Sequence, residues 1–184
     1  FIVINADKVN TIISASGSHT TINSNAQFNQ LCSTGGSADI SSTGDNNQIV
    51  STGDFSSIIS SGFETHIAST GSNAQIVSSG ILTEITSIGD DAHIITVGRD
   101  TFVNSNGNNA VIVCEGRGTK VKAKKGSLIT LTEWWTPSPY KGESEHNFIK
   151  RIKTEYVDGV NIKGDTWYEI RNGEFVETRL YTGH

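Results

Sequence analysis

The acidic side chains are the first candidates for chemistry in this sequence. They are densest at Asp90, Asp91 and Asp100, with Arg99 among them. Paired carboxylates carry out general acid–base catalysis on polysaccharides, and clustered carboxylates bind calcium. In an extended chain, however, Asp90 and Asp91 point to opposite sides, and acidic residues beside a turn are ordinarily solvated turn residues. We therefore predict no catalytic residues and no metal ligands here.

A nine-residue repeat sets the positions of these side chains. Glycine occupies every ninth position from Gly35 to Gly116, Gly17 fits the same frame, and Ala26 replaces glycine once. Nine residues suit one strand and one turn, and the period is too short for a pair of helices. Five places after the glycine position stands the aliphatic row: Ile4, Ile13, Ile22, Leu31, Ile40, Ile49, Ile58, Ile67, Ile76, Ile85, Ile94, Val103, Ile112 and Val121.

Alternation along each strand predicts which side chains face inward. The residue two places before the aliphatic row is small or short and polar, and the residue two places after it is usually serine. Because side chains alternate between the two faces of a strand, all three lie on one side and line a narrow interior. The inward serine hydroxyls are expected to satisfy one another or the corner backbone. In this interpretation the glycine provides the positive-φ corner at which the chain bends.

The full period is eighteen residues. Three places after the glycine position, residues 38, 56, 74, 92 and 110 are alanine or serine, whereas the intervening units have Asn47, Thr65, Thr83, Thr101 and Thr119. Two unlike nine-residue halves therefore make one coil. The sequence predicts an all-β fold, a two-sided β-solenoid (β-helix) of eighteen-residue coils, with about seven coils stacked at ~4.8 Å.

The repeat gives no sign of a cofactor or a metal, and we predict neither. Calcium-binding β-rolls need glycine and aspartate at fixed places in every nonapeptide, which this chain lacks. His66 and His93 are 27 residues apart, an odd number of half-coils, so we expect them on opposite sides of the solenoid. Cys32 and Cys114 form no disulfide framework, and we predict two free thiols.

One outward position is apolar in alternate half-coils. The residue directly after the aliphatic row forms a stripe there: Ile59, Val77, Ile95 and Val113. If the strands stay extended, the stripe lies on the outer surface, where contiguous apolar area usually marks association. We therefore predict a homo-oligomer, a dimer or trimer packed along the stripe. The alternative is that the chain bends early and buries these side chains.

Charge and composition change near residue 125. Residues 1–116 carry two basic and ten acidic residues, whereas residues 117–184 carry twelve basic and nine acidic ones. We predict a β-solenoid repeat domain at 1–125 and a small antiparallel β capping domain at 126–184, with hairpins at Asp158-Gly159 and Asn172-Gly173. The lysines at 120, 122, 124 and 125 are expected to protect the last coil from edge-to-edge pairing.

Two segments carry a resemblance to known sequences: KVKAKKGSLITLTEWW (residues 120–135) and IKTEYVDGVNIKGDTWYEIRNGEFVE (residues 152–177). The chain resembles uncharacterised proteins of phages, prophages and gut bacteria, in which runs of S-S-G-D-x-A-Q-I-x nonapeptides precede a tail of this type. The resemblance covers most of the chain, and the tail is its more specific part. It implies the solenoid shape and a phage-associated origin, and it assigns no activity and no functional residue.

The C-terminal aromatic residues are the remaining binding candidates: Trp134, Trp135, Tyr140, Trp167 and Tyr168. They either stack on a ligand or form the core of a small domain. Our first hypothesis is a non-catalytic structural or interaction protein, a rigid acidic spacer that displays the C-terminal domain. The second is a module that binds a carbohydrate or a host protein through these aromatics. The third is a polysaccharide-active β-helix enzyme.

Two classes of partner are not expected. The acidic solenoid disfavours nucleic acid, for which the lysine run at 120–125 is the sole basic patch. The opening Phe-Ile-Val-Ile is too short for a signal peptide or a membrane span, so a membrane partner is not expected either. The location stays open between the cytoplasm and a virion.

Overall fold

Each nine-residue unit forms one short strand, and successive strands alternate between two parallel sheets. The computed structural model describes residues 2–135 and 148–180, and every regular element in these ranges is a β-strand. Sheet A contains, in spatial order, β1 (Ile2–Ala6), β3 (Thr20–Ser24), β5 (Asp39–Ser42), β7 (Ser57–Ser60), β9 (Gln75–Ser78), β11 (His93–Thr96), β13 (Val111–Cys114), β15 (Leu128–Trp135) and β16 (Phe148–Tyr156).

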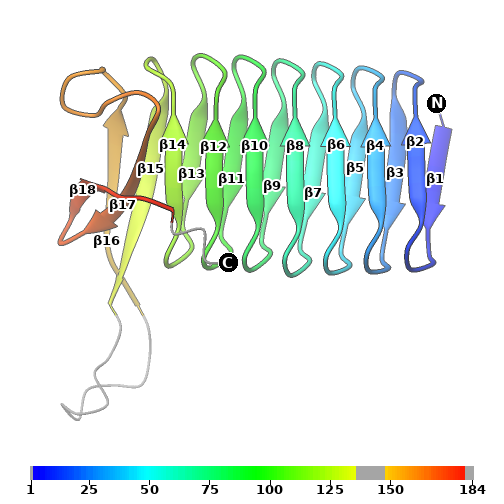
Figure 1. Ribbon diagram of the computed structural model, residues 1–184, viewed down its shortest axis with the longest axis horizontal. Coiled ribbons are helices and arrows are strands. Elements are labelled where there is room, and N and C mark those ends of the chain that lie inside the picture. Colours follow the sequence, from blue (N-terminus) through cyan, green and yellow to red (C-terminus); the bar gives the residue numbers. More distant parts are fainter. Residues whose placement is uncertain (1, 136–147, 181–184) are drawn as a thin grey trace, which may run out of the picture.

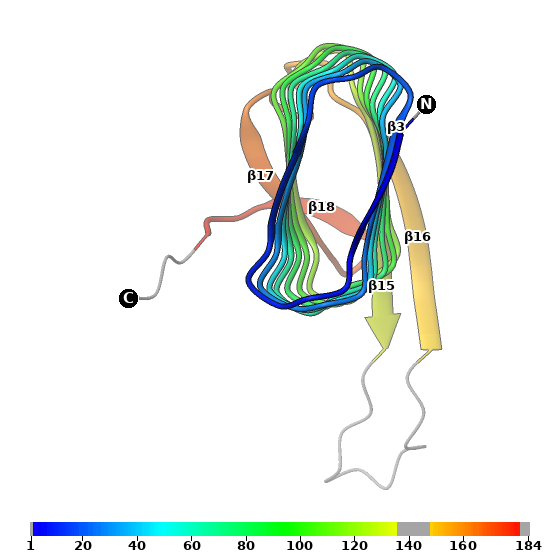
Figure 2. The same cartoon turned by 90° about the vertical axis from the view of Figure 1, so that its right-hand side faces the viewer.

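Sheet B lies opposite sheet A and contains the other half-coils. Its spatial order is β2 (Ile12–Ala15), β4 (Gln30–Ser33), β6 (Gln48–Ser51), β8 (His66–Ser69), β10 (Glu84–Ser87), β12 (Phe102–Ser105), β14 (Lys120–Ala123), β17 (Thr166–Arg171) and β18 (Glu174–Glu177). Figure 1 shows the strands stacked along a straight rod, and Figure 2 shows the flattened cross-section. This is the predicted two-sided β-solenoid, with about seven turns.

The register between coils is eighteen residues, as the sequence predicted. Ile22 pairs with Ile40, and Ile40 pairs with Ile58, so identical positions of the repeat stack on one another. The first departure comes at the end of sheet A, where Ile112 pairs with Ile129, only seventeen residues later.

The aliphatic row fills the interior. From Ile22 to Val121 every member of the row is at most 2% exposed. The residues two places before and after the row are buried along the same coils, for example Ala74 and Ser78 around Ile76. Inward serine oxygens are only partly satisfied, however. Ser51 donates to Ser56, whereas the hydroxyls of five others find no partner among the described residues: Ser33, Ser60, Ser69, Ser87 and Ser105.

The repeated glycine has a different role from the predicted one. Positive φ occurs two places later in the unit, at residues such as Asn46, Asn73 and Asn109, where φ is 56°. The glycine is required by space instead. A Cβ built on Gly71 would lie 2.1 Å from the carbonyl oxygen of Gly53 in the preceding coil. The prediction that glycine provides a positive-φ corner was therefore wrong. The glycine is where successive coils come into contact, and the bend lies two residues later.

The corners before sheet B carry asparagine or threonine throughout, whereas those before sheet A are mostly alanine, with Thr20 and Ser56 as polar exceptions within the repeat. The Asn47 amide donates to the Ser42 hydroxyl over 2.7 Å and to the Gly44 carbonyl over 3.1 Å, and its oxygen accepts the Asn29 backbone N–H over 2.7 Å. Further along the rod a threonine hydroxyl takes this place, as where Thr101 donates to the Gly98 carbonyl. Asparagine and threonine side chains thus form hydrogen bonds with buried backbone groups of the corner, which an alanine side chain cannot do.

The C-terminal strands extend both sheets. β15 runs parallel to β13 and antiparallel to β16, whereas β17 pairs antiparallel with β14 and then with β18. Asn172 and Gly173 both have positive φ, 53° and 79°, and form the predicted hairpin turn between β17 and β18. The hairpin predicted at Asp158-Gly159 is wrong, because this segment leads from β16 in sheet A to β17 in sheet B.

The lysines of the last coil do not protect a free edge. β14 carries Lys120 and Lys122, and its edge is already paired with β17. Lys122 Nζ instead lies 5.5 Å from the centre of the Trp167 ring. The predicted division at residue 125 falls between β14 and β15 and stays a prediction.

Candidate functional site

The predicted apolar stripe lies on the outer face of sheet A. Ile59, Val77 and Ile95 are 52%, 41% and 43% exposed, and each pairs with the next along the rod. Val113 follows in the same register and is half-buried. The alternative of an early bend that buries the stripe is therefore wrong. Whether copies associate here stays a prediction.

The apolar surface is larger than the sequence indicated. Leu128 pairs with Val111 on one side and with Tyr156 on the other, which adds a second row beside the stripe. Leu128, Tyr156 and Ile152 are 39%, 56% and 61% exposed. We call the combined surface the apolar face: Ile59, Val77, Ile95, Val111, Val113, Leu128, Ile152 and Tyr156. Strand β16 could not be placed beside β15 from the repeat, because the repeat has ended there.

The apolar face carries no charged side chain. Its other outward residues on β7, β9, β11, β13, β15 and β16, up to Ile152, are Ser57, Gln75, His93, Thr130 and Thr154. The Thr130 and Thr154 hydroxyls are 2.8 Å apart and bridge β15 to β16.

A cavity of about 350 Å³ lies at the C-terminal end of the rod. Three segments line it: the corner around Arg117 between β13 and β14, the end of β15 with Glu133 and Trp134, and the end of β17 with Glu169 and Arg171. Trp134 is fixed there by its Nε1, which donates to the Glu115 carbonyl over 2.6 Å.

Glu133 is the best-defined polar group of the cavity. Its Oε1 accepts the Asn172 backbone N–H over 2.9 Å and lies 3.4 Å from Lys150 Nζ. Its Oε2 is buried and has no hydrogen-bond partner among the described residues. The Thr132 hydroxyl on the same strand is also buried and has no hydrogen-bond partner among the described residues. Glu169, which also lines the cavity, forms an ion pair with Arg171.

The predicted aromatic residues are not brought together. Trp134 lines the cavity, whereas Trp135 stacks on Phe148 with ring centres 4.8 Å apart. Trp167 lies under Lys122 on the outer face of sheet B. Tyr168 is a core residue, 2% exposed, whose hydroxyl accepts the Lys163 backbone N–H over 2.9 Å. The fifth, Tyr140, lies outside the described residues.

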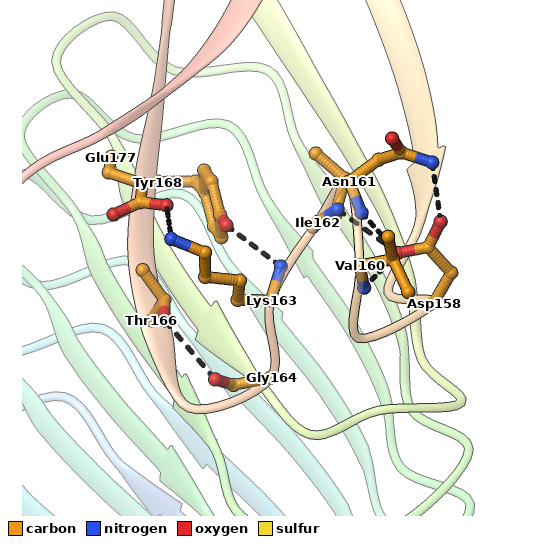
Figure 3. Close-up of polar contacts among 9 residues, drawn as sticks. All are labelled: Asp158, Val160, Asn161, Ile162, Lys163, Gly164, Thr166, Tyr168 and Glu177. Atoms are coloured by element: carbon orange, nitrogen blue, oxygen red, sulfur yellow. Dashed lines mark hydrogen bonds and ion pairs between the residues drawn. The ribbon is translucent and has the colours of Figure 1, made fainter.

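The crossover from sheet A to sheet B is held by one carboxylate (Figure 3). Asp158 Oδ1 accepts backbone N–H groups from Val160 over 2.7 Å, Asn161 over 2.8 Å and Ile162 over 3.1 Å. These bonds, the Val160 bond first among them, hold the pKa of Asp158 below its ordinary value. The geometry is that of a turn cap, and it explains the Asp158-Gly159 pair without a hairpin.

The acidic turn residues are structural links between coils. Asp45, Asp54 and Asp90 each directly follow a glycine of the repeat. The side chain of each accepts a hydrogen bond from the backbone N–H eighteen residues later, over 2.8 Å in every case. His66 lies on β8 of sheet B and His93 on β11 of sheet A, on opposite sides as predicted. In the described ranges no three His, Cys, Asp or Glu side chains are placed to hold a metal ion.

Both cysteines are free, as predicted. Cys114 occupies the inward position after the aliphatic row on β13 and is fully buried, and burial raises the pKa of its thiol. Cys32 is on sheet B and only half-buried.

Comparisons of the chain with protein-family models, with curated proteins and with solved structures find no match. In the described ranges, no helix long and apolar enough to cross a membrane is found. Function must therefore be inferred from the apolar face and the terminal cavity themselves.

Proposed function

We propose that this chain is a non-catalytic structural and interaction protein, a rigid rod that assembles with a second copy of itself through the apolar face. Its C-terminal strands are then presented at one end of the assembly. The phage-associated origin implied by the sequence resemblance belongs to the same proposal.

The observation that carries this proposal is the size and neutrality of the apolar face. Six strands of sheet A contribute to it, and at ~4.8 Å per strand and ~6.6 Å per outward residue their outward positions cover roughly 400 Å², of which the eight apolar side chains cover roughly 250 Å². Contiguous exposed apolar area of this kind usually marks association. A stable interface buries about 800 Å² per partner, so the patch would form the core and the flanking polar rows the rim.

Charge favours a second copy as the occupant. In a twofold-symmetric interface the same surface meets itself, so a charged residue near the axis would approach its own like charge. Residues 1–116 carry a net charge of −8, and the acidic turns such as Asp54 and Asp90 lie along the sides of the rod. Copies therefore repel one another at these corners, and the uncharged face is where they approach at least cost.

The rod is suited to spacing because its coils are bonded at each step. Backbone bonds join successive coils at the strands and also at the corners, for example from Phe55 N to Ser72 O over 2.9 Å. Seven coils at ~4.8 Å give a body roughly 34 Å long. Each coil supports only its neighbours, so stiffness is uniform along the rod.

Sedimentation velocity on a matched pair of double variants tests the proposal. Ile59→Asp with Ile95→Asp places two carboxylates on the apolar face two coils apart, and burial of each unpaired charge should weaken association at least about 100-fold. Val50→Asp with Thr86→Asp places the same charges at outward positions of sheet B, also two coils apart. We expect a monomer from the first variant and an unchanged oligomer from the second. A monomeric wild type, or a folded first variant that still assembles, would exclude this interface.

A further inference from the structure

We propose that the cavity at the C-terminal end of the rod binds a neutral carbohydrate, one or two sugar units in size. This site goes beyond self-assembly, because it lies at the tip of the rod and uses residues outside the apolar face. Its lining comes from three segments that are distant in sequence and that meet only because β15 and β17 extend opposite sheets.

The polar groups of the cavity need a partner that both donates and accepts hydrogen bonds. The Glu133 carboxylate lines the cavity as an acceptor that cannot donate, and its Oε1 is held in place by the Asn172 N–H. The Arg117 guanidinium, a donor with no acceptor role, lines the cavity and forms no ion pair with another described residue. A sugar hydroxyl donates and accepts at once, so adjacent hydroxyls of one ring can satisfy both groups.

Charge balance selects a neutral ligand. Among the side chains that line the cavity, the two carboxylates of Glu133 and Glu169 are matched by the two guanidinium groups of Arg117 and Arg171, and Lys150 Nζ lies 3.4 Å from Glu133 Oε1 outside the lining. An anionic ligand would meet the two carboxylates, and a cationic one would meet the two guanidinium groups. A neutral, polyhydroxylated ligand meets no such repulsion.

Trp134 supplies the apolar surface that a sugar ring needs. Its indole lines the cavity, and the bond from Nε1 to the Glu115 carbonyl fixes its orientation before any ligand arrives. A fixed aromatic side chain adds contact area with little loss of conformational entropy. The volume of about 350 Å³ is at the lower end of the range of about 300–1,000 Å³ for small-molecule sites, which suits a chain end rather than a long polysaccharide.

Calorimetric titration of the full chain tests the site, after a glycan array has selected among neutral oligosaccharides. The probes are the methyl glycosides of glucose, galactose, mannose and N-acetylglucosamine and the corresponding neutral disaccharides. Glu133→Gln keeps an oxygen for the Asn172 N–H but removes the charged acceptor, and we expect affinity to fall about 10- to 100-fold. Arg117→Gln should reduce affinity about tenfold or more.

Two variants serve as matched controls. Arg99 stands at the same place in the preceding coil as Arg117, eighteen residues earlier, and is exposed, so Arg99→Gln should bind as wild type does. Glu174→Gln changes an exposed carboxylate of β18 outside the cavity and should also leave affinity unchanged.

Three results would overturn the assignment. The first is that the folded wild type binds none of the neutral probes at concentrations up to about 10 mM. The second is that Glu133→Gln and Arg117→Gln bind as tightly as the controls do. The third is that only acidic sugars bind, which would make the cavity an anion site. Self-association is measured separately by sedimentation, so a negative result here leaves the proposal for the apolar face standing.

Discussion

A Gly71→Ala substitution should destabilise the rod strongly, even though it adds only one methyl group. The new Cβ would lie 2.1 Å from the Gly53 carbonyl oxygen and 2.4 Å from its carbon, both backbone atoms of the preceding coil. Side-chain Cβ atoms do not approach other atoms closer than about 3.0 Å. The two coils must therefore separate by about 1 Å at this corner, which lengthens hydrogen bonds near 3 Å beyond their useful range.

The energetic cost follows from the bonds that flank the corner. Phe55 N donates to Ser72 O over 2.9 Å, and Thr70 N donates to Ser51 O over 3.0 Å. Phe55 and Thr70 are exposed residues, so each lost hydrogen bond costs about 0.5–1.5 kcal/mol and the two together about 1–3 kcal/mol. With a urea m-value of about 1–3 kcal/mol/M, the unfolding midpoint should fall by roughly 1 M.

Gly17→Ala is the matched control. Gly17 has the same place in the repeat, but the nearest atoms to its added Cβ are Thr20 Oγ1 at 3.6 Å and Ile2 Cδ1 at 3.8 Å, which are ordinary contacts. Its φ is not positive, so alanine should be tolerated and should stabilise the fold by about 0.4–1 kcal/mol through the unfolded chain. Urea unfolding followed by far-ultraviolet circular dichroism compares the midpoints. Equal loss of stability in both variants would show that glycine is needed for conformation, and no loss in Gly71→Ala would refute close contact.

Three further outcomes are expected from other parts of the rod. Asn47→Ala leaves a buried corner N–H of the preceding coil unpaired and should lower the free energy of unfolding by about 3 kcal/mol in urea titrations. The Asp158 carboxyl, which accepts the Val160 N–H as its first bond, should show an NMR titration with a pKa below the ordinary value. Because the pKa is lower in the folded than in the unfolded protein, Asp158 stabilises the fold fully above the unfolded pKa, and this contribution is lost as the pH falls through the folded pKa. In native protein a thiol reagent should modify Cys32 well before Cys114, and both at equal rates only after unfolding.

The repetitive part of the fold could be predicted because each of its rules is local and is repeated many times. An aliphatic residue every nine positions and a polar or small corner every eighteen determine strand, face and register together. The cause of the glycine could not be predicted, because its Cβ contact is with a residue eighteen positions earlier. Positive φ at Asn73 or Leu82 could not be predicted from the sequence either, because this position of the repeat is occupied by many residue types and not by glycine or asparagine alone.

The candidate site was predictable only where it continues the repeat. The stripe at Ile59 and Ile95 follows from strand alternation, and its exposure is confirmed. Tyr156 and Ile152 were missed because antiparallel pairing with β15 has no counterpart in the solenoid. Glu133 and Arg117 were missed because they meet across the tip of the rod, and no local spacing relates them.

The constant offset between paired residues also limits how such a chain can change its length. Within the repeat, from β1 to β14, removal or duplication of one complete coil restores the cross-coil partners, because position i meets position i+18 there. An insertion or deletion of nine residues would instead stack asparagine corners on alanine corners. Beyond that point it would also move the apolar stripe from sheet A to sheet B. The length of the rod can therefore change only in steps of one coil, ~4.8 Å, and tolerated insertions should contain multiples of eighteen residues.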